Sequence, residues 1–272
     1  MSLPLADVTR RLKDDGDKAL VAFFTAGYPD EETFVEMAVA ASHAGADVIE
    51  IGIPFSDPIA DGPVIQSSSE TALAGGMTVA RALSLSGQIA GRVDTPLVAM
   101  GYVNPILNMG PERFVATAAA AGISGLILPD VPLEESADLR RITRSGGLSF
   151  IDLLAPTSDD DRVRRIAAAA AGAGGDGGFL YLVSVTGVTG SGSAGSADLE
   201  PFVARVRAAT TLPLYVGFGV STAQQARDTA QLADGVIIGS QLIRLAADGA
   251  AAGAAARISE FLTGVKEAIS RV

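Results

Sequence analysis

Residues 47–63 read DVIEIGIPFSDPIADGP, a short apolar run that passes into a proline-rich loop. The β-branched residues at its start are typical of a buried strand. Alternation along such a strand puts Ile49 and Ile51 on one face, and Glu50 and Gly52 on the other. Burying a carboxylate costs several kcal/mol of lost hydration, roughly, unless a partner or a purpose offsets it. We therefore predict a buried Glu50 with free space beside it, which the glycine provides.

The loop after this strand carries two further acids, Asp57 and Asp61. Asp57 precedes a proline and is a standard turn residue. For Asp61, which precedes Gly62, a turn role and a catalytic role are both open. A turn role does not apply to Glu50 in the middle of a strand, so we expect Glu50 to be catalytic. One acid on a strand and one on the following loop predict an acid–base pair.

The same kind of apolar run recurs along the chain, with helical spacing between the runs. The strand-like runs are Leu20–Gly27, Val48–Phe55, Leu97–Val103, Gly125–Val131, Leu148–Leu154, Phe179–Val185, Leu212–Gly219 and Gly235–Ser240. Strands that alternate with helices favour a parallel sheet. A TIM barrel is closed by eight such strands, so the pattern predicts a closed (β/α)₈ fold. The rival is a doubly wound open sheet, which carries a glycine fingerprint after its first strand. Here the first run ends in FTAGYP, which is no such fingerprint.

Several additions to the regular barrel are expected. Leu3–Lys13 has the pattern of a short amphipathic helix that could plug the barrel bottom. The gap after the second run predicts two helices, Val64–Ala74 and Val79–Ile89, and an extra helix is also expected after the eighth strand. Residues 186–196 are rich in glycine and serine, which predicts a mobile loop at the catalytic face. No domain boundary is visible, so residues 1–272 are expected to form one domain.

Composition narrows the classes of function. The net charge of −11 argues against a nucleic-acid partner, because phosphate neutralisation needs clustered Lys and Arg. No apolar run has the length of a membrane span, so we expect no membrane partner and a cytoplasmic location. The absence of cysteine excludes disulfides, thiolate metal sites and cysteine nucleophiles.

Further polar candidates follow the other strand-like runs: Tyr102, Asn104, Asp130, Asp152, Tyr181 and Thr189. In a barrel, the carboxyl ends of the strands and the loops after them form the active site. Asp130 and Asp152 have a simpler explanation, since carboxylates at strand ends commonly bind backbone amides. The single histidine, His43, lies on a predicted helix and is expected to be structural.

A phosphate site is predicted after the last two strands. Gly219 ends the seventh run, and Gly239-Ser240 ends the eighth just before another helix. Glycines let backbone amides approach an anion, and a helix N-terminus adds its dipole and free N–H groups. Glycines also end strands for steric reasons, but glycines after both of these strands, where barrels bind phosphate, strengthen the case.

Missing residue types argue against two reaction mechanisms. The lysines are Lys13, Lys18 and Lys266, and none follows a strand, which argues against a Schiff-base aldolase. One histidine and no cysteine leave a metal site short of nitrogen and sulfur ligands, so we expect no metal. Proton transfer by carboxylates on a phosphorylated substrate remains.

The first motif, EIGIPFSDPIADGP at residues 50–63, resembles the signature of the tryptophan synthase alpha chain family. The resemblance continues through MGYVNP (100–105), LPDVPLEE (128–135), YLVS (181–184), TGVTG (186–190), GFG (217–219) and GS (239–240). It covers essentially the whole chain in the expected order. It implies a (β/α)₈ barrel that cleaves indole-3-glycerol phosphate to indole and glyceraldehyde 3-phosphate by retro-aldol chemistry.

The resemblance also assigns roles to residues. It implies that Glu50 protonates indole C3 and takes the glycerol hydroxyl proton, while Asp61 holds the indole N–H and stabilises the cation on the ring. The implied substrate-binding residues are Phe23, Met100, Tyr102, Tyr181, Thr189 and Phe218. The implied phosphate ligands are Gly190, Gly219, Gly239 and Ser240.

A partner is implied as well: a beta chain that carries pyridoxal phosphate, in an α₂β₂ heterotetramer, with no cofactor in the chain itself. Three alternatives stay open at this point. They are a stand-alone lyase with the same site, a phosphosugar isomerase that shares only the phosphate site, and a silent subunit that only activates a beta chain.

Overall fold

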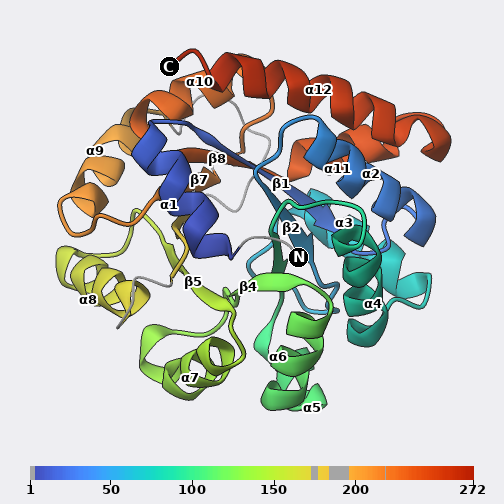
Figure 1. Ribbon diagram of the computed structural model, residues 1–272, viewed down its shortest axis with the longest axis horizontal. Coiled ribbons are helices and arrows are strands. Elements are labelled where there is room, and N and C mark those ends of the chain that lie inside the picture. The colour runs from blue at the N-terminus through green and yellow to red at the C-terminus, as the bar shows by residue number, and fades with distance from the viewer. Residues whose placement is uncertain (1–3, 173–176, 184–195, 218) are drawn as a thin grey trace.

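The computed structural model describes residues 4–172, 177–183, 196–217 and 219–272. Eight parallel strands form a closed barrel in sequence order, with β1 pairing with β8 (Figure 1). The strands are β1 (Ala19–Thr25), β2 (Val48–Gly52), β3 (Leu97–Met100), β4 (Ile123–Ile127), β5 (Ser149–Leu154), β6 (Leu180–Val183), β7 (Leu214–Gly217) and β8 (Gly235–Ile238). The predicted barrel is confirmed and the open sheet is excluded.

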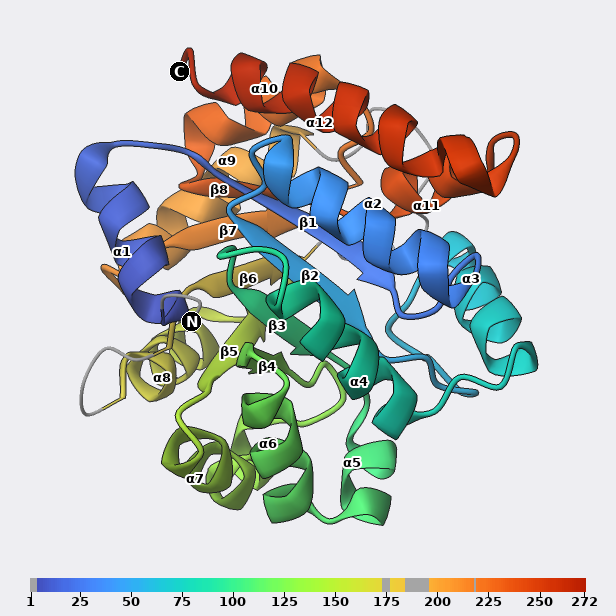
Figure 2. The same ribbon diagram turned by 45° about the vertical axis from the view of Figure 1, so that its right-hand side comes forward.

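A layer of helices surrounds the barrel, and α12 lies along α2 and α10 on its outside (Figure 2). The helices are α1 (Leu5–Asp15), α2 (Glu31–His43), α3 (Pro63–Ala74), α4 (Val79–Ala90), α5 (Val103–Met109), α6 (Pro111–Ala120), α7 (Ala137–Ser145), α8 (Asp160–Ala171), α9 (Ser196–Arg207), α10 (Ala223–Leu232), α11 (Ser240–Ala247) and α12 (Ala254–Ile269), with 3₁₀ turns η1 (Leu133–Glu135) and η2 (Ala251–Gly253). Among the helices of the described residues, none combines the length and the apolarity that a membrane crossing requires.

Strand β2 separates its two faces as its sequence predicts. Ile49 and Ile51 belong to the cluster of side chains packed between the barrel and the helices. Val48 belongs to a second cluster inside the barrel, and Glu50, two residues on, shares its face. In the sheet register Glu50 lies between Phe23 of β1 and Val98 of β3, so its side chain enters the barrel interior.

Helix α1 closes the amino-terminal end of the barrel, across which it lies in Figure 1. Its residues Leu5, Val8 and Leu12 pack into the interior cluster. Room for Leu5 comes from two glycines, because a Cβ at Gly125 or at Gly178 would lie 2.9 Å from its side chain. The predicted plug is therefore confirmed, and it fills the end opposite the predicted site.

The two predicted helices after β2 are present as α3 and α4, and the additional helix after β8 is present as α12. The prediction missed α5 and extended β3 to Val103, whereas the strand ends at Met100. Pro105 is compatible with this helix. It lies in the first turn, where its missing N–H has no helical acceptor to lose.

Candidate active site

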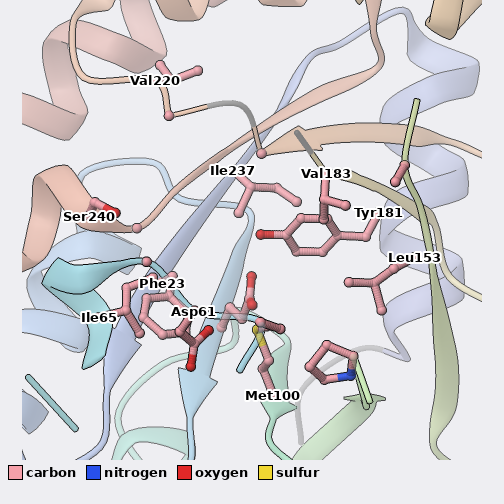
Figure 3. Close-up of a pocket in the computed structure, with 18 of the residues that line it drawn as sticks. Phe23, Asp61, Ile65, Met100, Leu153, Tyr181, Val183, Val220, Ile237 and Ser240 are labelled. Atoms are coloured by element: carbon pink, nitrogen blue, oxygen red, sulfur yellow. The ribbon is translucent and has the colours of Figure 1, made fainter. Parts of the chain in front are cut away.

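A cavity of about 440 Å³ opens at the carboxyl ends of the strands. Its lining includes both predicted acids, and Figure 3 shows Asp61 and Phe23 near one another, with Met100 and Tyr181 around the same space. The residues that line it include Phe23, Glu50, Asp61, Met100, Tyr181, Gly217, Gly219, Gly239, Ser240, Arg162 and Arg244. Strands from all around the barrel therefore contribute to one space.

Glu50 is fully buried in the cavity wall. Neither of its carboxyl oxygens has a hydrogen-bond partner among the described residues. Burial, and secondarily the charge of Asp61, raise the pKa of Glu50 from 4.5 to about 8. The side chain is therefore protonated at neutral pH, and a small change in its surroundings lets it release or accept a proton.

Asp61 lies in the loop between β2 and α3 and is held there by its backbone. Its N–H donates to Pro58 O at 3.0 Å, and its carbonyl accepts from Gln66 Nε2 at 2.7 Å. Burial raises the pKa of Asp61 to about 6, and a hydrogen bond from Tyr102 opposes this rise. At neutral pH Asp61 is ionised while Glu50 is protonated, so the two carboxyls hold opposite states, as an acid–base pair requires.

Tyr102 does not line the cavity, which differs from its predicted role as a substrate contact. Its ring stacks on Phe55 with centroids 5.3 Å apart, and its hydroxyl accepts from Ala60 N at 3.0 Å. The same hydroxyl is hydrogen-bonded to the carboxylate of Asp61. Tyr102 thus stands behind Asp61 and fixes the loop that carries it.

The rings of Phe23 and Tyr181 reach the cavity because glycines beside them leave space. A Cβ at Gly52 would lie 2.6 Å from the ring of Phe23, and one at Gly217 would lie 2.8 Å from the ring of Tyr181. Burial, followed by the charges of Glu50 and Asp61, raises the pKa of Tyr181 well above its usual value. The hydroxyl of Tyr181 is therefore a neutral group in the wall.

Three of the predicted phosphate residues, Gly219, Gly239 and Ser240, line the cavity. Gly219 has φ +67°, a conformation that favours glycine, and a Cβ there would meet open space. Gly239 precedes α11, and Ser240 is its first residue. The first N–H groups of a helix have no acceptor within it, so they are available to an anion. Thr189, Gly190 and Phe218 lie outside the described residues.

Two acids at strand ends are structural. Both carboxylate oxygens of Asp130 accept from Val103 N at 3.1 Å, as predicted. The prediction of a backbone partner is wrong for Asp152, which forms a bidentate buried pair with Arg140, one contact being 2.8 Å. Arg140 also lies over the ring of Phe150, 4.5 Å from its centroid. Sequence spacing alone did not reveal this pair, because it joins α7 to β5.

Sequence reasoning missed the cations of the wall, Arg162 and Arg244. A usable signal existed for Arg244, which lies four residues after Ser240 and so on the same face of a helix. Among the described residues, no group of His, Cys, Asp or Glu side chains could hold a metal ion.

Known proteins similar in sequence and those similar in structure point to the same family. The family model described as tryptophan synthase alpha chain matches residues 9–270. The tryptophan synthase alpha chain of Geobacter sulfurreducens is 44% identical over 265 residues, covering 97% of this chain and 98% of that one. A crystal structure of the alpha chain from Legionella pneumophila superposes with a TM-score of 0.88 at 33% identity, covering 100% and 99% of the two chains. A chain of Mycobacterium tuberculosis tryptophan synthase also gives 0.88 at 33% identity, with 99% of each chain covered.

Proposed function

The chain belongs to the tryptophan synthase alpha chain family, and from this premise we propose how its residues perform the reaction. The family consists of carbon–carbon lyases, and the chain is such a lyase: it cleaves indole-3-glycerol phosphate to indole and glyceraldehyde 3-phosphate in tryptophan biosynthesis. The observation that carries the assignment of residues is the buried, unpartnered carboxyl of Glu50 in the same cavity as Asp61.

Glu50 is the acid and the base of the proposed mechanism. In its protonated form it gives a proton to C3 of the indole, which makes the ring an indolenine cation. As a carboxylate it then takes the proton of the hydroxyl on the adjacent glycerol carbon. The carbonyl forms, the carbon–carbon bond breaks, and its electron pair returns to the ring. Glu50 ends the step protonated, as it began, now carrying the proton of the hydroxyl, while its first proton has gone to C3. A pKa near 8 suits both steps at neutral pH.

Asp61 is the electrostatic partner in this proposal. Its carboxylate accepts a hydrogen bond from the indole N–H. The same negative charge offsets the positive charge that protonation at C3 creates on the ring. The hydroxyl of Tyr102 keeps Asp61 ionised and oriented, so we assign Tyr102 a positioning role. Phe23, Met100 and Tyr181 supply apolar contacts to the indole, and the family resemblance adds Phe218.

The phosphate of the substrate is proposed to bind at Gly219, Gly239 and Ser240, with Gly190 from the loop after β6. Thr189 on that loop is proposed to contact the site when substrate is bound. The open space at Gly219 and the start of α11 support this arrangement. No metal takes part in the proposal.

A beta chain is implied by the family, and we propose that it forms an α₂β₂ heterotetramer and carries the pyridoxal phosphate. In this proposal the chain works as one domain in the cytoplasm. The partner docks at the carboxyl-terminal end of the barrel, on the loop between β2 and α3, which carries Asp61, and on residues 104–108. Two exposed large hydrophobic side chains lie in these segments: Ile59, which is 84% exposed, and Leu107, which is 54% exposed.

Indole release measured with and without a cognate beta chain tests the proposal. We expect slow release from the chain alone and faster release in the complex. Unchanged rates and no co-elution would leave a stand-alone lyase. No indole under either condition would refute the assignment.

A further inference from the structure

The cations that line the cavity within the described residues are Arg162 and Arg244. The lysines are occupied at the amino-terminal end of the barrel. Lys18 donates to Ala233 O at 3.0 Å, and Lys266 pairs with Asp47 at 2.6 Å. Any side-chain attraction that the cavity wall exerts on an anion must therefore come from the two arginines.

Arg162 is held in a salt bridge. Its guanidinium lies 2.6 Å from Oε1 of Glu134, which also binds Arg165 at 2.9 Å. The hydrogen bond from Arg162 is the main cause that lowers the pKa of Glu134 to about 2, so this carboxylate stays ionised at working pH. Glu134 therefore fixes the guanidinium of Arg162 and offsets part of its charge, which it shares with Arg165.

Arg244 differs from Arg162 in this respect. It is exposed, and it makes no hydrogen bond or ion pair with another residue that the structure describes. It lies one helical turn after Ser240 on α11, and both residues line the cavity. The side chain is therefore an uncompensated positive charge in the cavity wall to which Ser240 also belongs.

The net negative charge of the chain opposes the binding of a phosphorylated substrate. The chain carries a net charge of −11, and the cavity itself contains the ionised Asp61. Backbone amides at Gly219 and Gly239 carry only partial positive charges. A phosphate monoester that enters this cavity gains from a full positive charge near the place where its oxygens meet these amides.

We propose that Arg244 is a specificity-determining residue that pairs with the phosphate of the substrate. This inference rests on the proposed function and adds a side-chain cation to a site otherwise made of backbone amides and Ser240. Arg244 selects phosphorylated substrate over the neutral glycerol derivative, and it takes no part in proton transfer. Its contribution appears in binding and depends on salt.

Arg244→Gln and Arg162→Gln form a matched pair, because each removes one arginine from the same wall. For Arg244→Gln we expect KM for indole-3-glycerol phosphate to rise about tenfold, with kcat within about twofold of the wild type. The inhibition constant of inorganic phosphate should rise by a similar factor. Arg162→Gln should change both quantities much less, because Glu134 already holds and partly offsets that charge, and Arg244→Lys should recover most of the affinity, since a lysine keeps the charge.

Two further measurements show that charge is responsible. The difference between wild type and Arg244→Gln should shrink as ionic strength rises from about 0.05 M to 0.5 M, as screening predicts. Unphosphorylated indole-3-glycerol should bind both proteins equally.

An unchanged KM and phosphate inhibition constant in Arg244→Gln, with an active wild type, would overturn the inference but leave the proposed function intact. Equal effects of the two Gln variants would overturn it as well. A wild type that releases no indole contradicts the proposed function instead, and inorganic phosphate binding by calorimetry still tests Arg244 in that case.

Discussion

Tyr102→Phe removes one hydroxyl and leaves the ring stacked on Phe55. The carboxylate of Asp61 then loses a hydrogen bond that lowers its pKa. A hydrogen bond to a charged group contributes about 1.5–3 kcal/mol, which corresponds to about one to two pKa units. From its value of about 6, the pKa of Asp61 should rise to about 7–8 in the variant.

The activity of the wild type should follow a bell-shaped pH profile. It needs Asp61 ionised, above about pH 6, and Glu50 protonated, below about pH 8. In Tyr102→Phe the acid limb moves upward until it approaches the alkaline limb, and the plateau disappears. From titration alone, the catalytic efficiency at neutral pH should fall by about two- to ninefold.

The assay is kcat/KM for indole release from about pH 5 to pH 9.5. Gln66→Leu is the matched control, because Gln66 binds the backbone carbonyl of Asp61 and not its carboxylate. It should lower the rate without moving the acid limb. A Tyr102→Phe profile that superimposes on the wild type after scaling would refute the role of the hydroxyl.

Three other variants probe the cavity and its support. Glu50→Gln should lower indole formation at least about a hundredfold, because an amide cannot shuttle protons. Glu50 binds its proton more tightly in the folded protein than in the unfolded chain, so the wild type loses stability as that proton is released. Relative to Glu50→Gln, the free energy of unfolding of the wild type should fall by up to about 1.4 kcal/mol per pH unit between the ordinary glutamate pKa of 4.5 and the folded value of about 8. Urea titrations at a series of pH values measure this difference. Gly217→Ala should displace the ring of Tyr181 and raise KM severalfold in steady-state assays, whereas Gly264→Ala, on open helix surface, should not. Asp152→Asn should destabilise the fold by about 3–5 kcal/mol, measured by denaturation, because Arg140 stays buried without its counter-charge; an unchanged midpoint would contradict this.

Regular features could be predicted from sequence because they depend on local periodicity. Alternation in β2 placed Glu50 inside the barrel, and the spacing after β2 predicted α3 and α4. Features that depend on tertiary contacts could not be predicted from the sequence. Tyr102 follows β3, a position typical of a residue that contacts substrate, but its hydroxyl contacts Ala60 and Asp61 in the loop after β2. The partner of Asp152 is twelve residues away on another element, and nothing in the spacing singles out Arg140.

Helix α1 determines the end of the barrel from which the cavity can be reached. In the part of the chain that the structure describes, Leu5, Val8 and Leu12 fill the lower interior, and the cavity lies at the other end. Substrate and products therefore do not pass through the amino-terminal end of the barrel, and the cavity is reached from its carboxyl-terminal end. Because α1 fills the amino-terminal end, a partner bound over the carboxyl-terminal end of the barrel would control both the entry of substrate and the release of products.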